Sequence, residues 1–208
     1  MPSEPSDHTP SGNQPPARLA GALRADYRRY LASHRAVAGP FRASIAAALE
    51  FGFLAICVYR YGRWTRRIRP RILAWPLAFV YHLAHFATKV LFGIDLSTNS
   101  RIGPGLYIGH FGGIIIHGNL GAGCSVGQGV TVGSRGAGRS DGYPEIGDRV
   151  FLGAGSMVIG SVRVGNDVIV GANTVVVEDV PAGARVVSAH ARILPRRMRE
   201  VPVRRAAG

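Results

Sequence analysis

Cysteine is scarce in this chain of 208 residues. Cys57 and Cys124 are the only two, and both lie among apolar neighbours. We therefore expect two free, buried thiols in a reducing compartment and no disulfide framework. The N-terminus also lacks the basic and then apolar run of a secretory signal peptide, and opens with Pro, Ser, Glu and Asp instead. Together these features predict a cytoplasmic protein.

Acidic residues are few as well. Twelve Asp and Glu stand against 25 Lys and Arg, so the formal net charge is +13 with His neutral. Such a balance favours nucleic acid, an anionic membrane or a phosphate-bearing ligand as a partner. The chain has no zinc-ligand spacing, no basic strand studded with aromatics and no helix-turn-helix signature, so we expect no nucleic acid partner.

Long apolar runs free of charge are also missing. We expect a basic amphipathic helix over 18–38 and two more apolar helices over 41–61 and 75–92. The first apolar helix contains Glu50, and the second contains two histidines and a lysine. A membrane span needs about 20 largely apolar residues, and each buried charge costs a few kcal/mol.

These helices leave three arrangements open. The charges favour a helical cap, packed on the rest of the chain or on a neighbouring subunit. The dense cationic segment RWTRRIRPR between the two apolar helices would also suit peripheral contact with anionic lipid at the inner face of the cytoplasmic membrane. An integral membrane protein is the third alternative.

The most regular feature of the sequence is a six-residue repeat between Ile102 and Val180. Aliphatic residues recur at every sixth position, stop once, and then resume. Most of them are followed directly by glycine. The repeating residues are Ile102, Ile108, Ile114, Leu120, Val126, Val132, Ile146, Leu152, Val158, Val164, Val170 and Val176.

A period of six fits neither a helix, whose period is 3.6, nor a simple alternating strand, whose period is two. It fits one side of a triangular solenoid, in which a short strand is followed by a corner. We expect glycine at the corner because it permits backbone angles that a side chain forbids. A second inward position follows four residues after the repeating one, and is filled by Leu106, Cys124, Val130, Ser156, Val162, Val168 and Thr174. Repeats with this pattern resemble the left-handed parallel β-helix of the hexapeptide-repeat acyltransferases.

The predicted organisation has four parts. Residues 1–17, rich in Pro, Ser and Gly, should be disordered. A helical, apolar and basic region follows over 18–93, and then the β-helix over 94–187. The interruption in the repeat predicts an extruded loop near 134–145, a usual place for ligand contacts. A basic tail occupies 188–208.

His110 is the strongest candidate for chemistry. It stands between glycines in the second repeat, where a corner would expose its ring, and Asp95 precedes it by fifteen residues, close to one coil of eighteen. A carboxylate on one imidazole nitrogen fixes the tautomer and leaves the other nitrogen as a base. The alternative is a corner histidine and an Asp that caps a turn. His117 has no third histidine in the coils to complete a zinc site, so we expect no metal.

From about Tyr59 to Ile193 the chain resembles the serine acetyltransferase family. The similar stretches are GIDLSTNSRIGPGLYIGHFGGIIIHGN, VGQGVTVGSRGAG and PEIGDRVFLGAGSMVIGSVRVGNDVIVGANTVVVEDVP. The resemblance implies that His110 is the catalytic base, that Asp95 is its partner, and that acetyl-CoA donates the acetyl group. It also implies a homotrimer with sites between subunits.

The same resemblance implies residues that bind CoA. Backbone groups of Gly153, Ala154 and Gly155 would line the pantetheine groove, and Ser134 and Arg135 in the loop would contribute. Arginines near the C-terminus, Arg185 and Arg192, are candidate phosphate partners.

Two departures from the family concern the acceptor. An aspartate that helps hold the serine amino group is Gly109 here, and a histidine that contacts the serine carboxylate is Tyr143. A buried zwitterion needs charged partners, whereas a sugar hydroxyl does not. We therefore expect a sugar acceptor of an exopolysaccharide intermediate, because the chain also resembles the shorter colanic-acid-type O-acetyltransferases. L-serine, for cysteine biosynthesis, is the alternative. A non-catalytic, membrane-associated scaffold is an alternative of another class, but it has no use for an Asp95–His110 pair.

Overall fold

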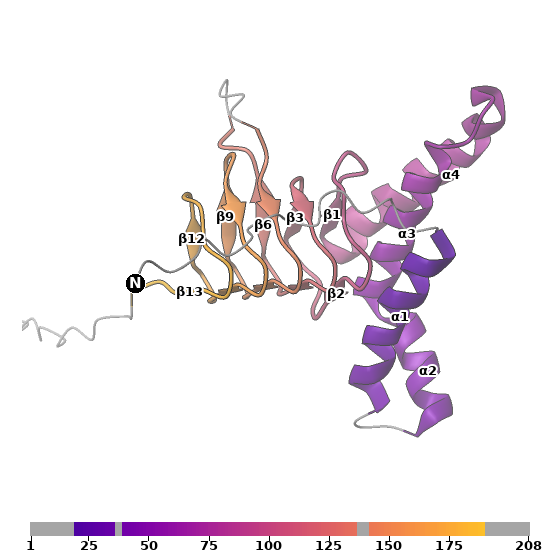
Figure 1. Ribbon diagram of the computed structural model, residues 1–208. Helices are drawn as coiled ribbons and strands as arrows, with labels where there is room; N and C mark the ends of the chain where they lie inside the picture. The colour runs from indigo at the N-terminus through magenta and orange to yellow at the C-terminus, as the bar shows by residue number, and fades with distance from the viewer. Residues whose placement is uncertain (1–18, 36–38, 137–141, 190–208) are drawn as a thin grey trace, which may run out of the picture.

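The computed structural model describes residues 19–35, 39–136 and 142–189. It consists of a helical layer across one end of a three-sided prism of short parallel strands (Figure 1). The segment 1–17, expected to be disordered, lies outside the described residues, and so does the basic tail apart from its first two positions.

The helical layer contains four α-helices and one π-helical turn among the described residues. They are α1 (Leu19–Arg35), α2 (Pro40–Leu49), α3 (Phe51–Thr65), α4 (Arg71–Ala87) and η1 (Thr88–Phe92). The helix expected over 41–61 is broken at Glu50, whose backbone is extended, with φ −60° and ψ 129°. None of the described helices can cross a membrane alone by length and composition. The pair α2 and α3, bent by 59°, meets that test together.

Thirteen strands follow in the described part of the chain. Face A of the prism contains β1 (Ile94–Leu96), β3 (Ile114–Ile116), β6 (Thr131–Gly133), β9 (Met157–Ile159) and β12 (Val175–Val176). Face B contains β4 (Asn119–Leu120), β7 (Glu145–Ile146) and β10 (Arg163–Val164). Face C contains β2 (Tyr107–Ile108), β5 (Ser125–Val126), β8 (Phe151–Leu152), β11 (Ile169–Val170) and β13 (Arg185–Val186).

Every strand pair is parallel, and the register shows the coil length directly. Tyr107 pairs with Ser125, eighteen positions later, as three six-residue sides require. Ser125 pairs with Phe151, twenty-six positions later, because the loop between β6 and β7 adds eight residues to that coil. The loop therefore leaves the prism without disturbing the pairing of the coils on either side.

The interior of the prism confirms the predicted repeat. All twelve repeating aliphatic residues are buried, and so are the seven residues expected at the second inward position. The hydrophobic ones among them form one continuous cluster that extends into the helical layer through Tyr30, Ile56 and Tyr59. Burial of apolar side chains, at roughly 25 cal/mol per Å², is thus spread evenly along the prism.

The reason expected for the glycine after each repeating residue is wrong. None of these glycines has a positive φ. Most of them are needed for space: a Cβ at Gly103 would lie 2.5 Å from the backbone nitrogen of Ala122, and one at Gly127 would lie 2.7 Å from that of Ala154. The left-handed backbone conformation occurs two residues later in the turn. Gly105 adopts it, and Arg149 adopts it at the equivalent position of another coil.

Polar side chains attach the helical layer to the first coil. Asp26 of α1 is fully buried and accepts hydrogen bonds from the backbone N–H groups of Gly105 (2.7 Å) and Leu106 (2.9 Å). It also accepts two from Arg60 of α3, which itself donates to the carbonyl of Ile102. Side chains of the helices thus satisfy backbone groups of the prism end, which no further coil covers.

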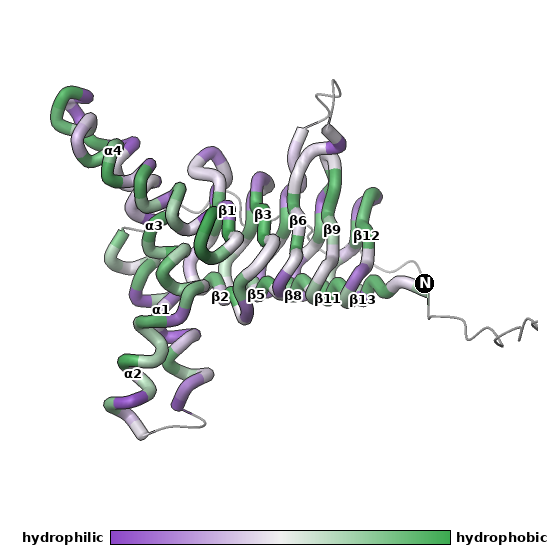
Figure 2. Tube along the Cα trace, turned by 180° about the vertical axis from the view of Figure 1, so that it is seen from behind, coloured by the Kyte–Doolittle hydropathy of each residue, from purple (hydrophilic) through white to green (hydrophobic). Residues whose placement is uncertain are grey.

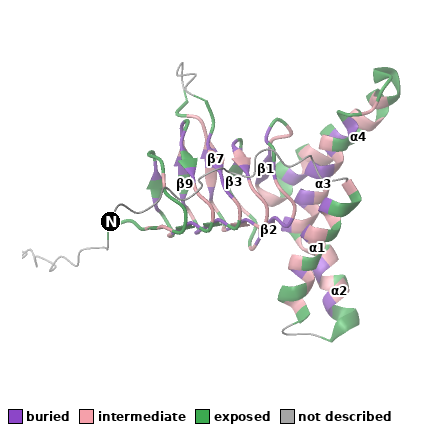
Figure 3. Cartoon of the chain, in the orientation of Figure 1, coloured by how far each residue is buried: buried purple, intermediate pink, exposed green. Residues whose placement is uncertain are grey.

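One face of α4 is apolar and exposed. Figure 2 shows α4 as largely hydrophobic, and Figure 3 shows its outer surface as exposed. The large hydrophobic residues exposed on α4 and η1 are Ile72, Leu73, Trp75, Phe79, Val80, Leu83, Phe86, Val90 and Leu91. A contiguous exposed apolar surface is typical of an interaction site.

Candidate functional site

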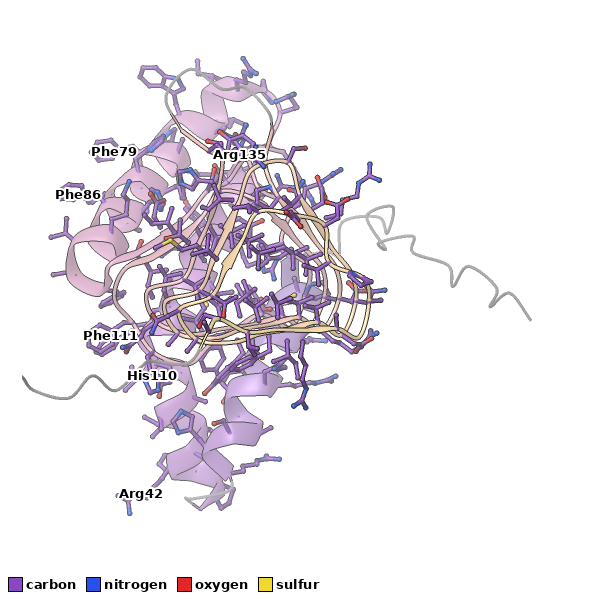
Figure 4. The ribbon with its side chains drawn as sticks, turned by 90° about the vertical axis from the view of Figure 1, so that its left-hand side faces the viewer. Arg42, Phe79, Phe86, His110, Phe111 and Arg135 are labelled. Carbon is purple, nitrogen blue, oxygen red and sulfur yellow. The ribbon has the colours of Figure 1, made fainter. Side chains whose placement is uncertain are left out.

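His110 lies in the turn between faces C and A. We call this edge of the prism the C–A corner; it is formed by the turns 109–113, 127–130, 153–156 and 171–174. The view along the prism axis shows His110 and Phe111 together at this corner, with Phe79 and Phe86 of α4 pointing outward on the same side (Figure 4). His110 is exposed, as predicted for a corner histidine.

A groove runs down the C–A corner beside His110. Its volume is about 430 Å³, and it is open to solvent. The lining residues come from the same turn in each coil: Phe111, Gly112, Gln128, Gly129, Ala154, Gly155, Ala172 and Asn173. Small residues and backbone line most of it, so a long flexible ligand can follow the prism and meet backbone hydrogen-bonding groups.

Asp95 lies elsewhere, at the centre of β1, the edge strand of face A beside the helical layer. Its Cα partner in the next coil is Ile115, which stands five positions after His110. The carboxylate is held by Lys89 Nζ at 2.9 Å and His85 Nε2 at 3.3 Å, and His117 Nε2 lies 3.6 Å away. The structure does not bring Asp95 and His110 into contact within one chain, so their pairing stays a prediction.

The electrostatics of this cluster follow from burial and charge. Burial would raise the pKa of Asp95, but the hydrogen bond and charge of Lys89, with His117 and His85, hold it below its ordinary value. Burial is also the main effect on His85 and lowers its pKa, which the nearby Asp95 carboxylate only partly offsets. Asp95 is therefore a carboxylate and His85 a neutral imidazole near pH 7.

Sequence reasoning missed the role of His85 and Lys89. They were considered only as charges that disfavour a membrane span. A signal was present, because residues four apart lie on the same side of a helix. The sequence did not show that this side of the helix faces Asp95, because that contact depends on how the helix packs on the prism. Within the described ranges, no group of three or more side chains is arranged to hold a metal ion.

The two positions that differ from the family pattern lie at different corners. Gly109 precedes His110 at the C–A corner, and a Cβ there would meet only Tyr107, at 3.5 Å. Tyr143 is exposed and lies between faces A and B, next to Pro144. We call that edge the A–B corner; it includes the turn 117–118 and the two ends of the extruded loop.

The residues predicted to bind CoA are also divided. Ala154 and Gly155 line the groove, and Gly153 precedes them in the same turn. Ser134 and Arg135 begin the loop at the A–B corner, where Arg135 donates to the carbonyl of Val177 at 3.2 Å. Arg185 is exposed on face C. Arg192 lies outside the described residues.

Comparison with known proteins places these features in a family. Residues 143–177 match the family described as "Bacterial transferase hexapeptide (six repeats)". The serine acetyltransferase of Helicobacter pylori is 35% identical over 145 residues, which cover 69% of this chain and 81% of that protein. The serine acetyltransferase of Synechococcus elongatus is 31% identical, over 70% of this chain and 57% of its own length.

A solved structure agrees. Soybean serine acetyltransferase complexed with serine is 30% identical, with a TM-score of 0.67 over 85% of this chain and 69% of that one. The left-handed parallel β-helix with N-terminal helices is therefore confirmed.

The expected closeness to exopolysaccharide O-acetyltransferases is not supported, and the expectation of a sugar acceptor is wrong. The two relatives and the solved structure described above are named serine acetyltransferases, and that structure is complexed with serine. The absence of charged partners at positions 109 and 143 misled the prediction, because other residues of a pocket can carry charge. By its repeats, its fold and its relatives, this chain belongs to the serine acetyltransferase family of hexapeptide-repeat transferases.

Proposed function

We propose that this protein is a serine O-acetyltransferase that transfers the acetyl group of acetyl-CoA to the hydroxyl of L-serine. The observation that carries the proposal is the position of His110, an exposed histidine at the head of a groove built from small residues and backbone. The names of the relatives support the choice of serine.

The proposed reaction needs one base that also acts as an acid. His110 takes the proton from the serine hydroxyl while the oxygen attacks the thioester carbonyl carbon. Backbone N–H groups stabilise the negative charge on the carbonyl oxygen of the tetrahedral intermediate. The intermediate then expels the thiolate of CoA, which receives the proton from His110. The products are O-acetylserine and CoA.

Asp95 is the proposed partner of His110. We propose that one copy of the chain supplies His110 and a neighbouring copy supplies Asp95. Within one chain the two residues lie apart: His110 is in the C–A corner, whereas Asp95 is on face A opposite Ile115, five positions after His110. If the C–A corner of one copy faces face A of the next, His110 and Asp95 meet the same substrate.

This arrangement extends to the whole molecule. A homotrimer would close the open groove and cover the apolar face of α4. Ser134 and Arg135 of one copy would then lie near the groove of another, in reach of CoA, with Arg185 and Arg192 as further phosphate partners. The helical region over 18–93 would act as an assembly element and the β-helix over 94–187 as the catalytic one.

Because acetyl-CoA is a cytoplasmic metabolite, we place the reaction in the cytoplasm. Contact of the arginines of the α3–α4 connection with the inner membrane surface would be additional to this.

The test is the release of CoA thiol from acetyl-CoA in the presence of L-serine. His110→Ala should lower kcat/KM on the order of 10²–10⁴-fold, because the hydroxyl loses its base. An unchanged rate would remove His110 from the mechanism. Failure of the wild-type protein to turn over L-serine would refute the proposed function.

Mixed trimers test whether the site is shared. His110→Ala and Asp95→Asn should each be nearly inactive alone. When the two variants are unfolded, mixed and refolded together, some interfaces regain both intact residues and part of the activity returns. If the mixture stays as inactive as its components, the two residues belong to one chain.

A further inference from the structure

We propose that Lys89 and His117 form the pocket that binds the α-carboxylate of the acceptor amino acid. Asp95 orients the two nitrogen donors and remains the proposed partner of His110. The inference rests on the proposed function, and it assigns specificity to Lys89 and His117, which the family pattern does not mark.

The first support is the geometry of the cluster. Lys89 Nζ and His117 Nε2 both approach the same oxygen of Asp95, Oδ2, at 2.9 and 3.6 Å. The two nitrogen atoms are therefore near enough to be bridged by one carboxylate. The lysine and histidine side chains are 47% and 42% exposed, whereas Asp95 is 19% exposed. A ligand from solvent thus meets the two nitrogen donors before the carboxylate beneath them.

The second support is the position of His117. The family's carboxylate-binding histidine is replaced here by Tyr143, at the A–B corner. His117 stands at the same corner, and the next residue, Gly118, is so close to Pro144 that an added Cβ would lie 2.8 Å from its carbonyl oxygen. His117 therefore brings an imidazole back to the corner from which position 143 has lost one.

The third support is the identity of residue 89. Lys89 is the only lysine in the chain, and the other basic residues among the 25 are all arginine. An ammonium is a compact point charge with three N–H donors, whereas a guanidinium is a rigid, planar fork. One donor satisfies Asp95, and the others remain for a second carboxylate.

The charges of the cluster suit a carboxylate ligand. The negative group of an α-amino acid needs a partner when water is removed. When serine binds, Lys89 keeps its ion pair with Asp95, and its remaining N–H donors and His117 meet the serine carboxylate. His85, neutral near pH 7, supports the other oxygen of Asp95.

A labelling experiment tests binding without catalysis. Because Lys89 is the only side-chain amine, an acetylating N-hydroxysuccinimide ester should modify it and the N-terminus, and mass spectrometry separates the two sites. L-serine at ten times its Kd should slow modification of Lys89 roughly tenfold relative to the N-terminus. Serinamide has an amine but no carboxylate, so at the same concentration it consumes as much of the ester as L-serine does. It should slow the modification of Lys89 far less.

Kinetics supply the second test. Lys89→Met should raise KM for L-serine on the order of 10- to 100-fold, with KM for acetyl-CoA unchanged, because a charge-assisted hydrogen bond to the acceptor is lost. His117→Gln should give a smaller rise. Lys89→Arg should recover part of the loss. Arg149→Met, which removes an exposed cation paired with Asp167 between faces B and C, is the matched control and should change neither KM.

The outcomes separate the two proposals. If the wild-type protein acetylates L-serine but Lys89→Met leaves KM for serine unchanged, and serine does not protect Lys89, the pocket is wrong and the function stands. If the wild-type protein neither turns over serine nor is protected by it, the proposed function fails. Protection by L-serine combined with a selective rise in its KM supports both.

Discussion

The prism and the helical layer are stabilised in different ways. Each coil of the prism repeats the same buried aliphatic residues and the same parallel backbone pairing, so no single coil is special. The helical layer has no repeat and depends on a few buried polar contacts, chiefly those of Asp26 and Arg60. A repeating structure spreads its stability along its length, whereas a unique junction concentrates it in a few residues.

The candidate chemistry lies where the two parts meet. Asp95 belongs to the first strand of the prism, and two of its three partners, His85 and Lys89, come from the last helices of the layer. His110 and Phe111 lie in the turn of the same end, where Phe111 stacks edge-on against Phe51 of α3 at 5.1 Å. The helices therefore position the site, and the regular coils below it supply the groove.

The strongest test of this comparison is the removal of Asp26. Asp26→Ala leaves Arg60 without its carboxylate and two backbone N–H groups unsatisfied, so it should lower the free energy of unfolding by about 3–5 kcal/mol. Urea unfolding monitored by circular dichroism measures the change.

An exposed ion pair of the prism provides the control. Arg149 and Asp167 are both exposed. Asp167 has a left-handed backbone with φ 60°, which Asn also tolerates, so Asp167→Asn should leave the urea midpoint nearly unchanged. If Asp26→Ala were equally harmless, the junction would not depend on its polar contacts.

A smaller effect is expected at Gly109. Most glycines that follow a repeating residue lie so close to the next coil that an added Cβ would clash with it. A Cβ at Gly109 has room. Gly109→Asp would restore the family's carboxylate beside His110 and should lower KM for L-serine by about 3- to 10-fold with stability unchanged.

The matched variant for this test is Gly103→Ala, because its Cβ would meet the backbone of Ala122. That variant should be clearly destabilised. A Gly109→Asp protein that unfolds as easily as Gly103→Ala would show that the C–A corner is as tightly packed as the rest.

The smallest expected effect is on pH dependence and concerns His85. Its pKa is lowered in the folded chain from an ordinary value of 6.5. As pH falls below 6.5, the unfolded chain takes up a proton more readily, so the folded state loses stability until pH reaches the lower, folded pKa. Above 6.5 His85 contributes no pH dependence.

His85→Gln should therefore lose less stability on acidification than the wild type. Between pH 7.5 and 5.5 we expect its Tm to fall by about 1–3 °C less. The rest of the chain is the same in both proteins, so the difference between them reports on His85. An equal fall in both proteins would mean that burial of His85 does not influence folding.

The sequence predicted the prism well because its rule is local. One aliphatic residue every six positions requires no knowledge of distant contacts, and every one of the twelve is buried as expected. The reason for the glycines was missed, because the close approach of Gly103 to Ala122 is a contact between coils. The break at Glu50 was missed too, because an apolar run of twenty-one residues gives no local sign of a bend.

By itself, the sequence determined the three-sided shape and the exposure of His110, since the first follows from the period and the second from its place at a corner. Only the tertiary structure decided what surrounds Asp95. Its partners come from a helix, a π-helical turn and the connection between β3 and β4, which are brought together by packing of the helical layer on the first coil. The sequence shows which residues carry charge, but the packing of the elements decides which charged residues meet. For this reason the acceptor expected from Gly109 and Tyr143 alone was wrong.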